Sequence, residues 1–116
     1  MYSIGEFSKI CGLSIDTLRY YEKQGLISAI RGKDHRRFYN EKDIAWVQFI
    51  IRLKKTGMKI KDIQKYAELR AQGDETIPER IKMLFAQLDQ LHDRQYEIEK
   101  QINFLEKKIK YYLKID

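Results

Sequence analysis

Residues 14–25, SIDTLRYYEKQG, are the stretch of sequence that decides the fold. Ser14 suits a helix N-cap and Gly25 suits the left-handed position after a helix end, so the stretch predicts a helix over residues 15–24. Residues 4–11 predict a shorter helix directly before it. Two short helices joined by a tight turn are typical of a helix-turn-helix, although an ordinary helical bundle contains similar pairs.

The outward side of this second helix carries the first candidate binding residues. Ile15 and Leu18 are expected to point into the core, which leaves the polar residues outside. Arginine can pair with guanine edges in the major groove, and tyrosine and lysine reach phosphates. A plain solvated helix face is the alternative interpretation. The candidate DNA contacts here are Ser14, Asp16, Thr17, Arg19, Tyr20 and Lys23.

A short hairpin, or wing, is predicted next. Leu26-Ile27 and residues 36–39 form strand-like runs on either side of a polar turn at residues 32–34. Basic residues crowd the turn and the second run, and such density is favourable beside a phosphate backbone. A solvated loop is the alternative. The candidates here are Arg36, Arg37 and Tyr39.

Two further helices follow the hairpin. Asn40 is expected to cap a helix over residues 41–55, whose apolar residues recur at helical spacing, and a fourth helix is predicted over residues 60–70. Lys59 and Lys61 lie at the start of that fourth helix, where backbone N–H groups and lysines both favour phosphate. Solubilising lysines are the alternative interpretation of this pair.

Apolar residues repeat every seven positions in the last third of the chain, after a polar linker at residues 72–77. From Pro78 to Leu113 the pattern predicts one helix about 54 Å long, at about 1.5 Å per residue. Such a helix cannot bury its apolar seam alone, so the repeat predicts a coiled-coil homodimer. Gln95 is the polar member, which we interpret as setting the register. The seam residues are Ile81, Leu84, Leu88, Leu91, Gln95, Ile98, Ile102, Leu105, Ile109 and Tyr112.

Charge separates the two halves of the chain. The net charge of the 116 residues is +6, but residues 1–70 carry +7 and residues 71–116 carry −1. A basic first part and a neutral second part predict that the first meets a polyanion. The N-terminus lacks a signal core and no run approaches a membrane span, so we expect a cytoplasmic protein without membrane association.

The sequence shows no recognisable catalytic or metal-binding pattern. The sequence contains one cysteine, Cys11, and two histidines, one of them His92 on a coiled-coil flank. Neither a paired nucleophile and base nor a phosphate-cradling glycine loop is recognisable. We therefore predict a protein that is not an enzyme and uses no metal or cofactor.

Several motifs together resemble the MerR family of bacterial transcription regulators. They are Ile4-Gly5-Glu6, Thr17-Leu18-Arg19-Tyr20-Tyr21-Glu22, Gly25-Leu26-Ile27, Arg31, Arg37, Tyr39, Asp43-Ile44 and Thr56-Gly57-Met58. The resemblance implies recognition-helix contacts by Arg19 and Tyr20 and wing contacts by Arg37 and Tyr39. Lys61 falls where the family often contacts the DNA backbone.

The same resemblance implies a mechanism. Family members pair through an antiparallel coiled coil and bind a pseudopalindromic promoter with a long spacer. They kink and untwist that spacer so that RNA polymerase engages both promoter elements. Promoter DNA, a second copy of the chain and, indirectly, RNA polymerase are thus the expected partners.

An unidentified small-molecule effector is left open. The chain is most similar to the aldehyde- and electrophile-responsive branch, but Arg52 stands where that branch has a reactive cysteine. Cys11 lies on an apolar stripe, where a buried, inert thiol is the favoured interpretation.

The sequence therefore predicts a mainly α protein of three parts. These are a winged helix-turn-helix domain over residues 1–71, a linker over residues 72–77 and a coiled-coil dimerisation helix over residues 78–116. Two rival functions stay open at this point: a coiled-coil adaptor, and an architectural protein that bends DNA without responding to an inducer.

Overall fold

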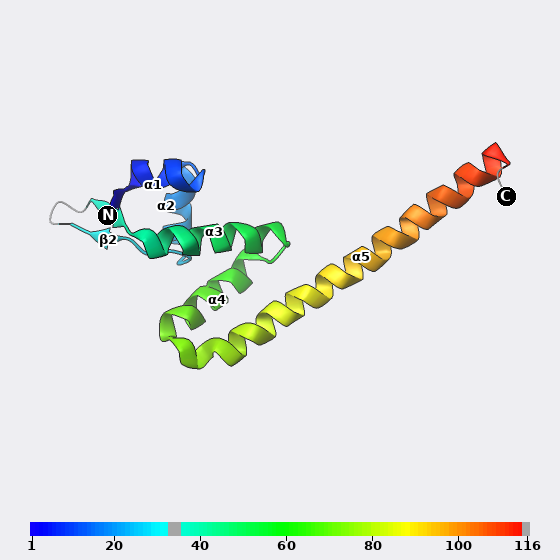
Figure 1. Ribbon diagram of the computed structural model, residues 1–116. Helices are drawn as coiled ribbons and strands as arrows, with labels where there is room; N and C mark the ends of the chain where they lie inside the picture. The colour runs from blue at the N-terminus through cyan, green and yellow to red at the C-terminus, as the bar shows by residue number, and fades with distance from the viewer. Residues whose placement is uncertain (33–35, 115–116) are drawn as a thin grey trace. The chain divides into compact units, whose positions relative to one another are not determined.

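The computed structural model describes residues 1–32 and 36–114, without the side chain of Arg37. It confirms a mainly helical chain, which divides into two compact units, Met1–Arg80 and Ile81–Asp116 (Figure 1). The first unit contains the helix-turn-helix and the wing. The second consists of most of one long helix.

The helix-turn-helix is built from α1 (Ile4–Cys11) and α2 (Ile15–Lys23). Ser3 caps α1 in a reciprocal pair with Glu6, and Ser14 caps α2 by accepting a 3.0 Å hydrogen bond from the Thr17 N–H. Gly12, with φ of +74°, takes the left-handed conformation that separates the two helices. The caps predicted from the sequence are therefore the ones that delimit these helices.

The wing differs from the predicted hairpin. Its strands are β2 (Ile30–Arg31) and β3 (Arg37–Tyr39), and β1 (Tyr2–Ser3) pairs with the other side of β3 to give the order β1-β3-β2. The prediction of a strand at Leu26-Ile27 was wrong. Both residues are buried, and the Leu26 carbonyl accepts a 2.7 Å hydrogen bond from the Trp46 indole N–H instead of joining a strand ladder.

The core of the first unit lies between these elements and two more helices, α3 (Glu41–Lys55) and α4 (Ile60–Gln72). Asn40 caps α3 in a reciprocal pair with Asp43, as predicted. Trp46, Val47, Ile50 and Leu53 form the buried stripe of α3, and α4 adds Ile63, Tyr66, Ala67 and Leu69.

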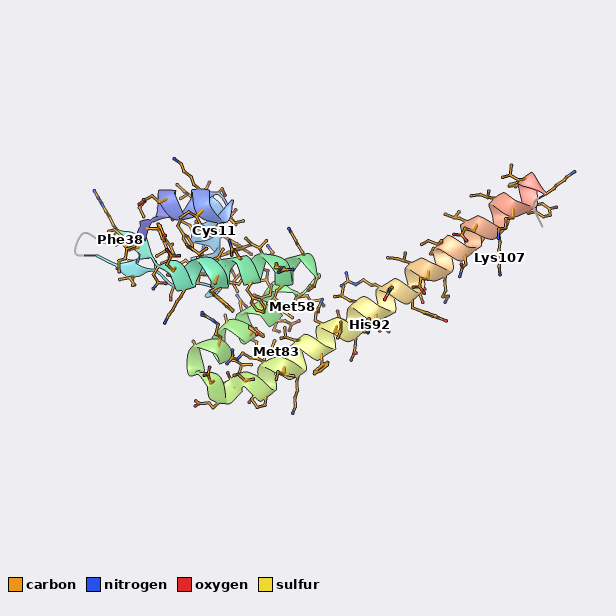
Figure 2. All side chains as sticks on the ribbon, viewed as in Figure 1. Cys11, Phe38, Met58, Met83, His92 and Lys107 are labelled. Atoms are coloured by element: carbon orange, nitrogen blue, oxygen red, sulfur yellow. The ribbon has the colours of Figure 1, made fainter. Side chains whose placement is uncertain are left out.

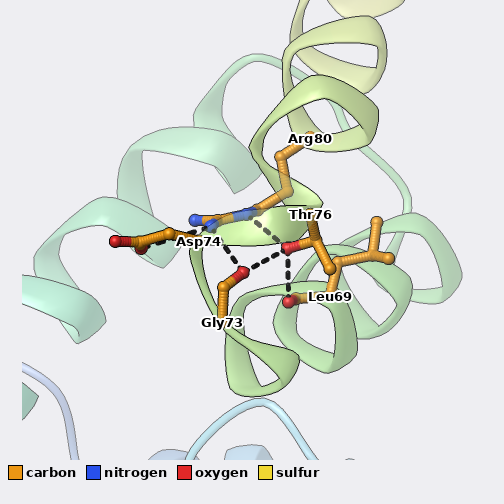
Figure 3. A network of polar contacts seen from close by, with 5 residues as sticks. All are labelled: Leu69, Gly73, Asp74, Thr76 and Arg80. Atoms are coloured by element: carbon orange, nitrogen blue, oxygen red, sulfur yellow. Dashed lines mark hydrogen bonds and ion pairs between the residues drawn. The ribbon is translucent and has the colours of Figure 1, made fainter.

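A polar network holds the junction between α4 and α5 (Ile77–Leu113) through the short 3₁₀ helix η1 (Asp74–Thr76) (Figure 3). The buried Thr76 hydroxyl lies 2.6 Å from the Leu69 carbonyl oxygen and 2.8 Å from that of Gly73. The Arg80 Nε donates to the same hydroxyl at 3.0 Å, and its Nη2 donates to the Gly73 carbonyl at 3.2 Å. The residues predicted as a polar linker thus contain a hydrogen-bonded turn.

The second unit, taken by itself, is the α5 helix from Ile81 onward, along which side chains project outward, His92 and Lys107 among them (Figure 2). The whole of α5 comprises 37 residues, or about 56 Å at about 1.5 Å per residue. Within residues 1–32 and 36–114, none of the helices combines the length and apolar character that a membrane span requires.

Candidate nucleic-acid interface

The outward side of α2 presents the residues predicted to meet DNA. Leu18 and Tyr21 are buried beneath the helix, whereas Arg19 and Tyr20 are exposed, Tyr20 by 46%. The Arg19 guanidinium lies 4.0 Å from the Asp16 carboxylate, but both side chains face solvent, so this pair is weak and leaves Arg19 able to bind elsewhere. Lys23 and Ser14 are also exposed, and Thr17 is half-buried.

Two of the predicted α2 residues have structural partners already. The Ser14 and Thr17 hydroxyls lie 2.8 Å apart, and Ser14 also accepts the Thr17 N–H. These bonds satisfy the first turn of α2. Ser14 and Thr17 therefore form the start of the helix whose later residues face outward, and a DNA contact from either stays a prediction.

Two contacts from α2 to neighbouring elements were not foreseen from the sequence. Glu22 forms a 2.7 Å ion pair with Arg31 of β2, and the Gln64 amide of α4 donates to the backbone carbonyl and side-chain oxygen of Gln24, both at 2.9 Å. They fix α2 against the wing and against α4. In the sequence, only the position of the acidic Glu22 among basic residues could have indicated its ion pair. No local pattern indicated the contact made by Gln64.

The wing residues predicted to bind DNA separate into different environments. Arg36 is exposed, and the side chain of Arg37 lies outside the described residues. Tyr39 is fully buried and stacks on Phe7, with ring centroids 4.2 Å apart and planes 4° from parallel. The assignment of Tyr39 as a DNA contact is thus corrected: its ring belongs to the core, facing inward from β3.

Lys59 and Lys61 lie at the N-terminus of α4, as predicted, and both are exposed. Lys59 occupies the N-cap position without a side-chain hydrogen bond to the helix. Backbone N–H groups at such an end carry partial positive charge that favours an anion. Asp62 in the first turn also interacts favourably with that partial charge.

The predicted coiled-coil seam is largely exposed in the single chain. Ile98, Leu105 and Tyr112 expose 59%, 58% and 70% of their surface, and Ile81, Leu84, Phe85 and Leu88 line an apolar hollow of about 270 Å³. Leu84 and Leu91 are half-buried, and Gln95 is exposed. Contiguous apolar surface of this kind is typical of a protein interface.

Among residues 1–32 and 36–114, no group of three or more histidine, cysteine or acidic side chains is placed to hold a metal ion. Cys11 is half-buried, and burial raises the pKa of its thiol above the ordinary value. A raised pKa lowers the share of reactive thiolate at a given pH. The thiol is half-buried, not buried as predicted, and its inert role stays a prediction.

Comparison with known proteins agrees with this geometry over nearly the whole chain. The family described as MerR HTH family regulatory protein matches residues 2–69, and the one described as MerR, DNA binding, matches residues 44–108. The chain belongs to the MerR family. The two matches span the helix-turn-helix, the wing, α3, α4 and most of α5, so the family resemblance seen in the sequence motifs is confirmed.

Individual relatives are similar over a comparable extent of the chain. An uncharacterized HTH-type transcriptional regulator of Haemophilus influenzae is 34% identical over 97% of this chain and 84% of its own length. Among solved structures, HiNmlR, a MerR family regulator lacking the sensor domain and bound to promoter DNA, matches with a TM-score of 0.79 and 33% identity, covering 97% of this chain and 90% of its own. A MerR family regulator from Bacillus thuringiensis matches with a TM-score of 0.74 and 33% identity, covering 96% and 98%.

Proposed function

We propose that this MerR-family regulator binds a promoter as a homodimer and controls transcription by distorting the spacer between the promoter elements. The observation that carries the proposal is the outward side of α2, where Arg19 and Tyr20 are exposed on a helix held by caps and by contacts to the wing and α4. The promoter-bound structure of HiNmlR, similar over nearly the full chain, supports DNA of the same kind as the partner.

The division of labour among the interface residues follows from their positions. Arg19 is the residue proposed to read a base edge, since a guanidinium can pair bidentately with guanine. Arg36, Lys59 and Lys61 are proposed to contact phosphates, which positions the protein without specifying sequence. Arg37 keeps the role that the family resemblance implies.

Dimerisation is proposed to occur through α5. The exposed seam residues from Ile81 to Tyr112 would be covered by the seam of a second copy, which presents two basic units to one duplex. The family resemblance makes this coiled coil antiparallel. We retain residues 1–71, 72–77 and 78–116 as the functional division into DNA-binding domain, junction and dimerisation helix.

The remaining parts of the proposal come from the family. Bending and untwisting the spacer would let RNA polymerase engage both elements, so the polymerase is an indirect partner. A transcription regulator of this kind acts in the cytoplasm and is not an enzyme.

The test is footprinting of the full chain on the DNA upstream of its own gene and its neighbours. We expect a protected inverted repeat lying between the two promoter elements, with permanganate-reactive thymines in the spacer marking unstacked bases. Protection that ignores sequence, or a preferred site outside promoters, would instead favour an architectural protein. Binding of a different protein through the α5 seam, together with no preference for any DNA sequence, would favour a coiled-coil adaptor.

A further inference from the structure

A cleft in the Met1–Arg80 unit lies apart from the residues proposed to contact DNA. It is an open cleft of about 420 Å³, bounded by α3, α4 and the first turn of α5. Small-molecule sites in proteins are clefts of about 300–1,000 Å³ lined by aromatic side chains and a few polar groups. The lining residues are Lys42, Ala45, Trp46, Phe49, Tyr66, Arg70 and Arg80.

Three aromatic rings form one wall of this cleft. The ring centroids of Trp46 and Phe49 lie 5.8 Å apart, those of Phe49 and Tyr66 lie 5.5 Å apart, and those of Trp46 and Tyr66 lie 6.1 Å apart. Trp46 and Tyr66 are buried, each with 7% of its surface exposed, and Phe49 is half-buried. Such a cluster offers a planar guest the offset or edge-to-face contacts that aromatic rings prefer.

The charged residues of the cleft all carry the same sign. Lys42, Arg70 and Arg80 are cationic, and the lining includes no aspartate or glutamate. The guanidinium carbon of Arg70 lies 4.1 Å from the centroid of the Trp46 ring. A guanidinium that lies over an aromatic face keeps its N–H donors in its own plane, where a carboxylate can accept two of them.

Arg80 adds to this group a cationic side chain whose position is fixed by hydrogen bonds. Its Nε and Nη2 bind Thr76 and Gly73, so the side chain is fixed at 15% exposure, and among the described residues its Nη1 has no hydrogen-bond partner. The nearest carboxylate is that of Asp74, 4.0 Å from Nη2, and it is fully exposed. Solvent screens an exposed acid of this kind, so the cleft stays electropositive.

We propose that this cleft binds a small planar aromatic carboxylate. Its ring would lie against Phe49 and the edges of Trp46 and Tyr66, and its carboxylate would accept hydrogen bonds from Arg70, with Lys42 and Arg80 adding attraction. The cationic lining disfavours aromatic amines, and a neutral aromatic of the same shape would lose the charge-assisted bonds. The proposal assigns a chemical class to the unidentified effector. It rests on the residues that line the cleft and does not depend on DNA binding.

The experiment uses the full chain and Trp46, which is its only tryptophan and lies in the cleft. The probe is 4-nitrobenzoate, whose nitro group quenches indole fluorescence on contact, and the matched neutral probe is 4-nitrobenzamide. We expect saturable quenching by the carboxylate, confirmed by titration calorimetry, and binding of the amide weaker by about tenfold or more.

Substitutions assign the binding to the cleft. Arg70→Gln is expected to weaken 4-nitrobenzoate binding about tenfold, and Lys42→Gln, at an exposed position, by about threefold. Lys65→Gln removes the same charge from an exposed position on α4 outside the cleft and is expected to leave the Kd unchanged. If Arg70→Gln loses its helical circular dichroism, Lys42→Gln carries the test.

The contrary outcomes are equally definite. Equal binding of acid and amide, quenching that does not saturate, or variants that bind as well as the original chain would overturn the proposal. So would the absence of any probe binding by a chain whose circular dichroism shows it to be folded. The affinity for operator DNA is measured separately on the same variants. Loss of operator binding would contradict the proposed function, whereas the outcomes above would contradict the cleft proposal alone.

Discussion

The two compact units differ in whether their apolar residues are buried or exposed. All buried hydrophobic residues of the described chain lie between Phe7 and Leu69, in the first unit, whereas from Ile81 onward the large apolar side chains are mostly exposed. The first unit closes over its own core with α helices and a small sheet. The second is a single helix that has no core of its own, so its stability and function require another surface.

Charge follows the same division. The excess of lysine and arginine lies within residues 1–70, at +7, and residues 71–116 carry −1. A self-contained basic unit is suited to a polyanion, and a neutral apolar helix is suited to association with its own kind. Reading DNA and pairing chains therefore belong to different units. A substitution on the DNA-facing side of the first unit should weaken DNA binding and leave the dimer intact, whereas one in the seam should break the dimer and weaken DNA binding through that loss.

The largest expected effect comes from the seam. Ile102→Asp places a charge at the centre of the predicted coiled coil, and we expect the dimer to dissociate and operator affinity to fall by about a hundredfold or more, because two linked contacts become one. Sedimentation velocity and DNA titration measure the two effects. Asn103→Asp adds the same charge at a position outside the seam and should leave the dimer intact.

A persistent dimer in Ile102→Asp would contradict the seam assignment. Loss of the dimer in both variants would show that charge alone, and not the heptad position, governs association.

The next effect comes from α2. Arg19→Ala should weaken binding to the cognate operator by about 1–3 kcal/mol and leave binding to unrelated DNA nearly unchanged, since a base contact is lost. Fluorescence anisotropy with both duplexes measures the difference. Lys9→Ala, an exposed cation on α1, is the matched control and should retain specific binding. Equal weakening on both duplexes would reassign Arg19 to the phosphate backbone.

A stability effect is expected at the junction of α4, η1 and α5. Thr76→Val keeps the side-chain shape but removes the hydroxyl that Arg80 Nε donates to, so unfolding free energy should fall by about 1–3 kcal/mol. Urea titration followed by Trp46 fluorescence at one fixed protein concentration measures it. Thr76→Ser, which retains the hydroxyl, should lose clearly less; an equal loss would mean that packing, not the network, matters.

The smallest effect concerns Cys11. Because burial raises the pKa of its thiol, the thiolate fraction at a given pH is lower than in the unfolded chain, and alkylation by iodoacetamide should be slower. The pH at which the alkylation rate rises should also be higher for the folded chain than for the chain unfolded in urea. Mass spectrometry of timed samples measures both rates. Faster reaction in the folded protein would make Cys11 a sensor candidate after all.

The sequence predicted well the features that depend on local chemistry. Ser3, Ser14 and Asn40 are capping residues whose side chains satisfy backbone N–H groups a few positions later, so α1 and α3 have the expected bounds and α2 ends one residue early. The heptad pattern likewise predicted the long α5.

Features that depend on distant contacts were not predictable in the same way. Strands of two or three residues, such as Ile30–Arg31, are too short to show an alternating pattern, and a buried apolar pair in a loop, Leu26-Ile27, looks like a strand. Tyr39 was predicted to face DNA, whereas its ring faces inward from β3 and stacks on Phe7. No local pattern shows this contact because Phe7 is far from Tyr39 along the chain. The Gln24–Gln64 contact joins residues forty positions apart and left no local trace.

The most direct test of the account is the stoichiometry of the protein on its operator, measured by analytical ultracentrifugation with a labelled duplex. Because a self-contained basic unit is proposed to be paired by α5, we predict two chains per duplex, and a dimer of the same chain without DNA. A single chain bound to the operator with full affinity, and no dimer in its absence, would contradict the account.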